Sequence, residues 1–475
     1  MKYNKLIVFL SIVVILFSCK KEKLDLVAEQ SLSEDIALSS KVTAQSVLLG
    51  VYSTAQSLDA FGAGPQIVGD YQADNVDFVG SFPTLQDIKL YNTISTNASV
   101  AGWWQVHYQM ISRANTIISR VPGIVDVTFT VAERNQMVAE AKCLRAMAYF
   151  QLANLFSHPY QVSNGTNLAV PLVLEAFTGV PTFPARATLN EVHAQIKKDL
   201  DEAIASPLPA TYTAGADTRG KITIGGARSL LSRLALYRGD WTAAADAANL
   251  VINNTAVYSL AASYNFGRNT SEDIFSLQMT ATDNSRTGSG GWASYYRPAA
   301  VGGRGDCPMT ADLDATFQQE AGDRRYALSA IGTAADGLSK RFTLKFPDAS
   351  TNTDNSPLIR LPEVMLNRAE ALAQRDGLNQ TSVDLINALR VRAGLSSRTL
   401  LSFPTKPSLI DAILNERRKE LCFEGHRRMD LLRIGKALAT GSLAAVSVPG
   451  ADKTILPIPQ REIDNNKSLI QNKGY

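Results

Sequence analysis

Residues 222–254 read ITIGGARSLLSRLALYRGDWTAAADAANLVINN. Apolar residues recur three and four positions apart on both sides of a central break, which is the spacing of amphipathic helices. The break is RGDW at residues 238–241, where glycine and aspartate favour a turn. Alanines stand at positions 244, 247 and 248, where small side chains would let two helices approach closely. The stretch therefore predicts a helical hairpin.

This hairpin resembles the tetratricopeptide (TPR) unit, in which glycine and an aromatic residue mark the turn and alanines fill the close-packed positions. A strict repeat of about 34 residues does not run through the chain, so other units must be divergent. Helical periodicity, read outward from the hairpin, begins near residue 42 and continues over 103–121, 131–156, 188–205, 362–374, 381–393, 408–424 and 426–434. We expect an all-α fold, a scaffold of divergent TPR-like hairpins with little β-structure.

Two long segments interrupt the helical pattern, residues 61–101 and residues 258–356. Both are rich in glycine, aspartate, asparagine and aromatic residues. Connections of this length inside a compact domain are usually functional. We expect both segments to be irregular loop insertions that carry a binding surface.

The N-terminus has the pattern of a secretory signal. Lys2 and Lys5 precede an apolar run that ends at Phe17, and charged residues follow directly after Cys19. The run is too short to cross a bilayer, and its ending resembles a bacterial lipoprotein signal, in which the cysteine is acylated on its sulfur. We expect a signal peptide over 1–18, a lipidated tether over 19–40 and one folded domain over 41–475.

The composition excludes several classes of protein. The chain has 475 residues and a formal net charge of +3, which does not suggest a partner nucleic acid. Besides Cys19, the cysteines are Cys143, Cys307 and Cys422, which form neither a disulfide framework nor a metal-ligand spacing. The four histidines share no metal-ligand spacing either. We expect no metal and no cofactor, with Cys143 and Cys422 in the core.

Several motifs occur in an order that resembles the SusD/RagB family of Bacteroidetes outer-membrane lipoproteins. After Cys19 they lie at residues 49–52, 104–115, 140–150, 359–371, 386–395, 416–433 and 456–475. The strongest of them is Glu416-Arg417-Arg418-Lys419-Glu420-Leu421-x-Phe423-Glu424-Gly425-His426-Arg427. A single motif of this kind would be weak, but several in the right order are specific.

The resemblance implies a function. Members typically sit on the cell surface, anchored by lipid in the outer membrane, and bind a nutrient for a SusC-like TonB-dependent transporter. The ligand is expected to be a glycan or oligosaccharide, with peptide capture of the RagB kind as the alternative. Family members are not enzymes, so the resemblance implies no catalytic residue. A lipid-anchored glycoside hydrolase and a TPR scaffold for other proteins are the remaining alternatives.

The two insertions supply the candidate ligand-binding residues. Sugars stack their C–H faces on aromatic rings, while carboxylate and amide groups bond their hydroxyls. The candidates are Trp292, Tyr295, Tyr296, Asp70, Asn75, Tyr91 and Asn92. Trp292 is the preferred anchor, because Gly290 and Gly291 would let the backbone present its ring outward. The alternative is that these aromatic residues fix the loops onto the scaffold.

A cluster of charged residues lies on the predicted helix 408–424 and just after it. Its members are Glu416, Glu420, Glu424, Arg427 and Asp430. Carboxylates at this spacing lie on one face of a helix, and arginines nearby can balance them. We favour an ion-paired structural corner over an acid/base set that includes His426. Gly425 suits the position after a helix end.

Overall fold

The computed structural model describes residues 38–264, 266–284 and 290–475. The expected signal peptide and the acylation site Cys19 lie outside these residues, as does the expected tether up to residue 37. The prediction of lipidation at Cys19 therefore stays a prediction.

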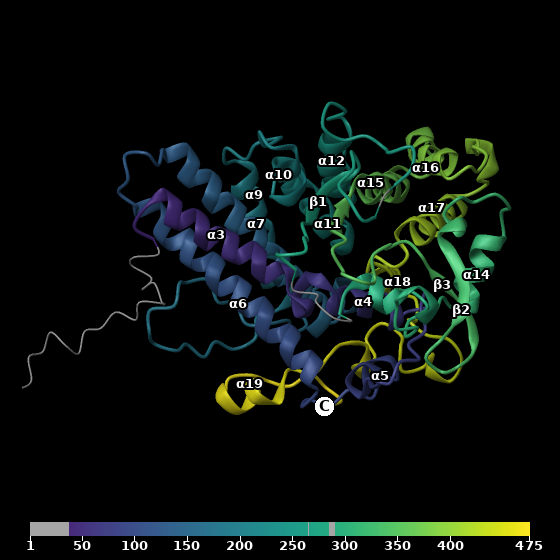
Figure 1. Cartoon of the computed structure of the whole chain (residues 1–475), viewed down its shortest axis with the longest axis horizontal. Helices are drawn as coiled ribbons and strands as arrows, with labels where there is room; N and C mark the ends of the chain where they lie inside the picture. The colour runs from purple at the N-terminus through teal and green to yellow at the C-terminus, as the bar shows by residue number, and fades with distance from the viewer. Residues whose placement is uncertain (1–37, 265, 285–289) are drawn as a thin grey trace, which may run out of the picture.

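Within the described residues, nine long helices form a continuous row from one end to the other. They are α3 (Lys41–Gln56), α6 (Ala98–Arg120), α7 (Val131–Phe156), α9 (Leu189–Ile204), α11 (Ile224–Arg238), α12 (Trp241–Ile252), α15 (Leu361–Asp376), α16 (Gln380–Arg392) and α17 (Lys406–Leu421). Each helix of the row packs against the one before it, and α17 also contacts α15. Figure 1 shows the row running from the purple and blue N-terminal helices to the green and yellow C-terminal ones. The predicted all-α fold is confirmed.

Local capping explains why the sequence forms the central hairpin, α11 and α12. The Thr223 side chain accepts a hydrogen bond from the Gly226 amide, and the Asp240 side chain accepts one from Ala243, so each helix has a side-chain N-cap. Gly239 ends α11 with φ of 77°, a conformation that favours glycine. The Ser232 hydroxyl donates to the Ala244 carbonyl across the hairpin at 2.9 Å. The predicted helical hairpin is confirmed.

The two insertions are not irregular, because each holds short regular elements. The first contains α4 (Gly64–Tyr71) and α5 (Pro83–Lys89). The second contains β1 (Asp273–Leu277), α13 (Trp292–Tyr296), α14 (Ala311–Gln318), β2 (Ser329–Thr333), β3 (Ser339–Thr343) and, at its end, β4 (Ser356–Arg360). Strand β1 pairs antiparallel with β4, and β2 pairs antiparallel with β3. Elements of five to eight residues are too short for helical periodicity to reveal them.

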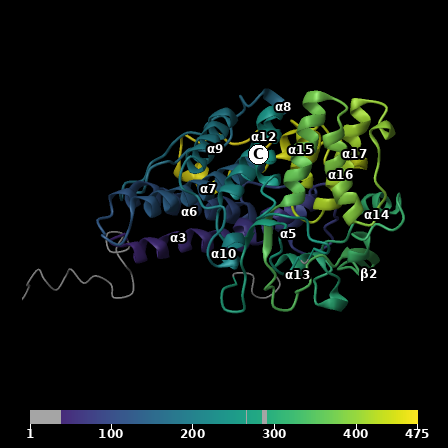
Figure 2. The same ribbon diagram turned by 90° about the horizontal axis from the view of Figure 1, so that it is seen from above.

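The remaining elements are short. They are the π-helix η2 (Leu58–Gly62), α8 (Tyr160–Ser163), α10 (Gly215–Gly220), α18 (Arg427–Arg433), α19 (Gln460–Asn465) and the 3₁₀ turns Val121–Gly123, Ala299–Val301, Tyr326–Leu328, Leu400–Ser402, Gly441–Leu443 and Asp452–Thr454. The insertions gather on one side of the helical row, where Figure 2 shows α5, α13 and β2 near one another.

The last long helix is shorter than its sequence suggests. Helix α17 ends at Leu421, although the apolar pattern extends to Glu424. Phe423 has φ of 67° and Gly425 has φ of 82°, so two residues within three adopt the left-handed conformation. Gly425 consequently belongs to the turn between α17 and α18 and does not follow a helix end directly. This turn packs against α4, where a Cβ on Gly69 would lie 2.1 Å from the Gly425 carbonyl oxygen.

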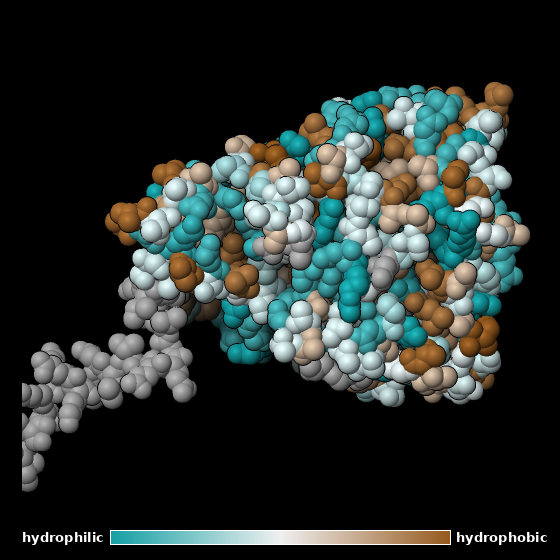
Figure 3. All heavy atoms as spheres, turned by 45° about the horizontal axis from the view of Figure 1, so that its top comes forward, coloured by the Kyte–Doolittle hydropathy of each residue, from teal (hydrophilic) through white to brown (hydrophobic). Residues whose placement is uncertain are grey.

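The described surface mixes hydrophobic and hydrophilic side chains (Figure 3). No helix within residues 38–264, 266–284 and 290–475 has the length and apolarity that crossing a bilayer requires. Figure 3 shows hydrophobic side chains in small groups among hydrophilic ones on the face in view. The core runs through the helical row and includes Cys143 and Cys422, as expected, together with Cys307.

Candidate functional site

Trp292 does not present its ring to solvent, so the prediction of an outward-facing anchor at this residue is wrong. Its side chain is 2% exposed and meets Phe346 edge to face, with ring centroids 4.9 Å apart. The two preceding glycines allow the loop to pack closely against its neighbours; they do not turn the Trp292 ring outward. A Cβ on Gly290 would lie 2.7 Å from Leu58, and one on Gly291 would lie 2.2 Å from Asn352. The loop is thus pressed against its neighbours, and Trp292 points into the core.

Asp70, Asn75 and Tyr296 form a buried junction. The Asp70 carboxylate accepts hydrogen bonds from the Gly425 amide at 2.8 Å, the Tyr296 hydroxyl at 3.2 Å, and the Phe423 amide and Asn75 side chain at 3.3 Å each. Burial raises the Asp70 pKa to about 6, although these donors oppose the shift. The junction ties the first insertion to the second and to the turn after α17, in a place that a ligand from solvent does not reach.

The remaining predicted residues are divided between core and surface. Tyr91 is buried and donates to the Gln72 carbonyl at 2.7 Å. Asn92 is exposed, and its side chain makes no hydrogen bond within the described parts of the chain. Tyr295 is half-buried and lines a surface pocket. Of the seven candidates, only Tyr295 and Asn92 therefore lie where a ligand from solvent reaches them.

Replacement of Asp70 tests its structural role. Asp70→Ala leaves four donors without their acceptor in a buried junction, so we expect the free energy of unfolding to fall by about 1–3 kcal/mol. Asn92→Ala, in the same insertion, should change it by less than about 0.5 kcal/mol. Urea denaturation of both variants measures the difference. Equal stability of the two variants would contradict the junction.

One pocket joins the two insertions, as the sequence suggested for the ligand site. We call it the Asp59 pocket. It has a volume of about 170 Å³ and is lined by Leu58, Asp59, Ala63, Gly64, Ile67, Tyr71, Phe82, Thr84, Leu85, Ser99, Trp103, Gly290 and Tyr295. These residues come from η2, α4, the start of α5, the first turns of α6 and the second insertion. The pocket thus lies where five segments meet.

The π-helix η2 places Asp59 at the pocket. The Ser57 hydroxyl caps this helix by accepting from the Asp59 amide at 3.3 Å, and Ala60 within it has non-helical dihedral angles. Irregular turns of this kind are frequent at functional sites. Burial raises the pKa of the Asp59 carboxyl. Within the described residues its carboxylate has no hydrogen-bond donor or ion-pair partner, so its acceptor capacity is available to a ligand.

Aromatic rings form the walls of the Asp59 pocket. Trp103 is 1% exposed and lies at the base, whereas Phe82 is 45% exposed at the rim. Arg304 lies between the rings of Phe82 and Tyr295, with its guanidinium carbon 4.2 Å and 4.3 Å from their centroids. The same guanidinium pairs with Asp306 at 2.5 Å. Arg304 therefore holds the two aromatic rims together, since a cation over each ring is attractive.

Hydroxyl groups complete the pocket. The Ser99 hydroxyl donates to the Thr84 hydroxyl at 2.9 Å, and Asn97 caps α6 while donating to the Thr84 carbonyl. The Tyr71 hydroxyl is buried without a hydrogen-bond partner in the described structure. Flat apolar rings beside a carboxylate and hydroxyls are the combination that recognises a sugar, whose faces are apolar and whose edges are polar.

Sequence reasoning missed Asp59, Phe82, Trp103 and Arg304. Asp59 precedes the first insertion, and Trp103 follows it directly. Their position was the available signal. A residue at the junction between a long loop and a helix is held in place by the rigid scaffold, so it is a candidate for a binding site. Nothing in the local sequence around Arg304 shows that its partners are Phe82 and Tyr295.

The predicted charge cluster is buried and paired with cations. Glu424 bonds Lys345 at 2.5 Å and Arg360 at 2.6 Å, and Glu416 bonds Arg325 at 2.6 Å. Glu420 contacts Arg325, Arg360 and Arg392. Asp430 bonds Arg417 and Arg433, and Arg427 bonds Asp74 at 2.5 Å. This is the geometry of an ion-paired corner, in which each carboxylate is already held by guanidinium or ammonium groups.

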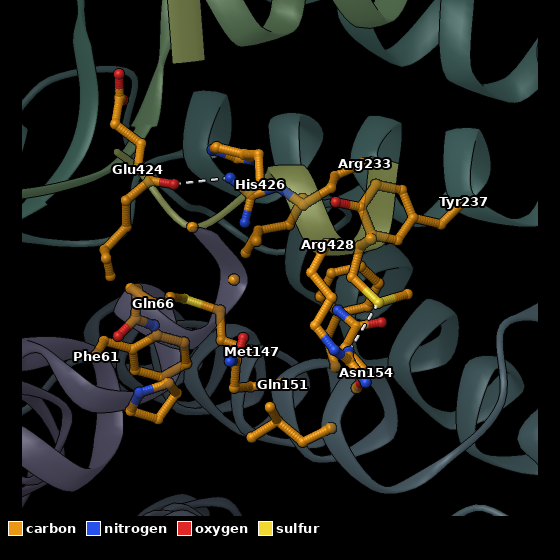
Figure 4. Close-up of a pocket in the computed structure, with 18 of the residues that line it drawn as sticks. Phe61, Gln66, Met147, Gln151, Asn154, Arg233, Tyr237, Glu424, His426 and Arg428 are labelled. Atoms are coloured by element: carbon orange, nitrogen blue, oxygen red, sulfur yellow. Dashed lines mark hydrogen bonds between the residues drawn. The ribbon is translucent and has the colours of Figure 1, made fainter. Parts of the chain in front are cut away.

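A small interior cavity lies beside this corner, between α4, α7, α11 and residues 424–429. Figure 4 shows His426 and Arg233 on one side of it, with Gln66 and Met147 opposite. Its volume of about 70 Å³ has room for a few waters at most. Burial lowers the His426 pKa to about 4. The Glu424 carboxylate is engaged by Lys345 and Arg360, so the cavity lacks a free acid/base pair.

Three comparisons relate the chain to known proteins. A family model described as the SusD family matches residues 337–475, and one described as starch-binding, associating with the outer membrane, matches residues 24–236. The chain is 26% identical to SusD-like protein P38 of Formosa agariphila, over 97% of this chain and 96% of that protein.

Solved structures share the fold over most of the chain. A SusD superfamily protein from Bacteroides thetaiotaomicron superposes with a TM-score of 0.82 at 26% identity, covering 90% of this chain and 98% of that one. A laminarin-binding SusD-like protein superposes with a TM-score of 0.74 at 25% identity, covering 92% of this chain and all of that one. The similarity thus extends over the helical row and both insertions.

Proposed function

This chain belongs to the SusD/RagB family, and from that premise we propose that it is a surface lipoprotein that captures a glycan in the Asp59 pocket. It then passes the glycan to a SusC-like TonB-dependent transporter. In this proposal residues 1–18 are a signal peptide, Cys19 carries the lipid that anchors the protein in the outer membrane, and residues 41–475 form the binding domain.

The composition of the Asp59 pocket carries the proposal of glycan capture. Phe82 and Tyr295 supply accessible flat rings above the buried Trp103, and Asp59 supplies a carboxylate with no partner in the described structure. One matching family is described as starch-binding, and one relative of the same fold is described as laminarin-binding. These descriptions support a glycan as the class of ligand.

The arrangement of the charged groups favours a binding protein over an enzyme. A glycoside hydrolase needs two carboxyl groups flanking the bond that breaks. Among the described residues that line its pocket, Asp59 alone is acidic, and the carboxylates of the corner are held by cations. We therefore propose a binding protein and not a lipid-anchored hydrolase.

Calorimetric titration of the purified chain tests the proposal. The ligands are oligosaccharides prepared from starch and from laminarin, beside a set of short peptides. We expect saturable binding of at least one glycan and loss of most of that affinity in Phe82→Ala. Binding of peptides alone would move the protein to the peptide-capturing branch of the family. A folded chain that binds neither class would contradict nutrient capture.

Replacement of Cys19 tests the proposed anchor. Cys19→Ala should release the protein from the membrane fraction without unfolding it. The lipid on Cys19 would supply the membrane affinity, and no helix of the described residues can cross a bilayer. Cell fractionation and labelling with a fatty acid measure the effect. Circular dichroism of the released protein shows whether it is folded. Salt-resistant membrane binding of the variant would contradict the anchor.

A further inference from the structure

A second cavity lies beside helix α17, the last of the helical row. We call it the Lys419 cavity. It has a volume of about 230 Å³ and lies between residues 262–264 with Phe266, the β2–β3 hairpin and helix α17. No residue lines both this cavity and the Asp59 pocket. It is therefore a separate compartment of the molecule.

Aromatic rings form part of the wall of the Lys419 cavity. Tyr264 and Phe266 meet edge to face with centroids 3.9 Å apart, and Phe317 and Phe423 complete the aromatic lining. The Tyr264 hydroxyl donates to Asp273 at 2.6 Å, which fixes its ring. An apolar wall of this kind suits the face of a flat ring.

The charged groups of the lining are mostly cationic. Arg324, Arg325, Lys345, Arg392 and Lys419 line the cavity, with Glu420 as the single carboxylate among them. Burial opposes the ionisation of Glu420, but Arg392, Arg360 and Arg325 together hold its pKa well below the ordinary value. Its charge is thus already balanced by guanidinium groups.

In the ion-pair network behind the cavity, the numbers of positive and negative charges are not equal. Its carboxylates are Glu272, Glu320, Asp323, Glu416, Glu420 and Glu424. Its cations are Arg325, Lys345, Arg360, Arg390, Arg392, Arg398 and Lys419. Within the described residues these groups pair only with one another, so the network holds one cation more than it has carboxylates.

Two cations remain poorly satisfied. The Lys419 side chain is 1% exposed, and its ammonium lies 3.6 Å from Glu320 and 3.8 Å from Asp323, too far for a hydrogen bond. Arg324 is exposed at the rim, where its guanidinium has no hydrogen bond or ion pair within the described ranges. A region with excess positive charge and free donors attracts an anion.

We propose that the Lys419 cavity binds a carboxylate attached to a six-membered ring, with the ring against the aromatic wall and the carboxylate toward Arg324. Two kinds of compound share this chemistry, a uronic acid sugar and an aromatic carboxylic acid. The proposal does not depend on glycan capture in the Asp59 pocket, because the two sites share no residue.

Calorimetric titration of the full chain in detergent tests this site with two matched pairs of probes. The first pair is D-glucuronate and D-glucose, and the second is 4-hydroxybenzoate and 4-hydroxybenzamide. We expect the acid of at least one pair to bind at millimolar concentration or below, and its neutral counterpart to bind at least about tenfold more weakly. Selective binding of glucuronate identifies a sugar acid, and selective binding of hydroxybenzoate identifies an aromatic acid.

Variants locate the site. Arg324→Gln, at an exposed position, should weaken binding of the acid about tenfold. Arg461→Gln makes the same substitution at an exposed position of α19 and should leave binding unchanged. Asp59→Asn should also leave it unchanged, which separates this site from the glycan pocket. Equal binding of acid and neutral probe, no binding of either acid, or equal effects of the two arginine variants would overturn the proposal.

Discussion

Glu424→Gln should lower the free energy of unfolding by about 3–5 kcal/mol, the cost of breaking a buried ion pair on one side. The Glu424 carboxylate is buried and bonds both Lys345 and Arg360. Burial opposes its ionisation, but Arg360 and Lys345 outweigh that effect and hold its pKa below the ordinary value. A neutral amide would leave two buried cations facing a donor group. Guanidinium denaturation and the melting temperature measure the loss.

An exposed ion pair supplies the control for Glu424. Glu202 bonds Lys142 at 2.6 Å, but its side chain is 42% exposed. Glu202→Gln should therefore change stability by less than about 1 kcal/mol. If Glu424→Gln lowers the melting temperature no more than Glu202→Gln does, the corner is not a structural ion-pair cluster. Unchanged melting together with loss of a glycan-hydrolysing activity would favour the enzyme alternative.

Asp59→Asn should lower glycan affinity at least about tenfold without lowering stability. A charged acceptor contributes about 1.5–3 kcal/mol to a hydrogen bond, and the substitution removes that charge while keeping the shape of the side chain. Burial raises the pKa of the Asp59 carboxyl, so the folded protein holds this charge at a cost. Removing the charge should leave the melting temperature unchanged or higher, which is the signature of a binding residue.

An exposed carboxylate provides the matched control for Asp59. Asp411 lies on the surface of α17 at the other end of the helical row. Asp411→Asn should alter neither affinity nor melting temperature. Titration and thermal unfolding of both variants separate the two effects. A lower melting temperature for Asp59→Asn with normal glycan binding would identify Asp59 as structural.

Local sequence patterns were sufficient to predict the helical row. Helix α7 covers 131–156 as its periodicity indicates, and the Gly239 turn lies where glycine and aspartate interrupt the pattern. Helical spacing, caps and turn residues are all encoded within a few positions of one another. The end of α17 was misplaced because Phe423, a bulky residue, adopts φ of 67°, which local preference opposes.

The candidate site was harder to predict, because its residues come from segments far apart in the chain and meet only in the folded structure. The pocket does join the two insertions, but Trp292 and Asp70 turned out to be buried. Glycine before an aromatic residue permits either outward display or close packing. The contact of Gly291 with Asn352 decides between them, and it joins residues far apart in the chain. The same is true of Arg304, which lies against Phe82.

A crystal structure of the chain with the tightest-binding oligosaccharide of the panel tests the central claim most directly. The account predicts a sugar ring in the Asp59 pocket, in contact with the rims formed by Phe82 and Tyr295, with a hydroxyl bonded to the Asp59 carboxylate. An oligosaccharide bound elsewhere on the molecule, with the Asp59 pocket unchanged and empty, would contradict it.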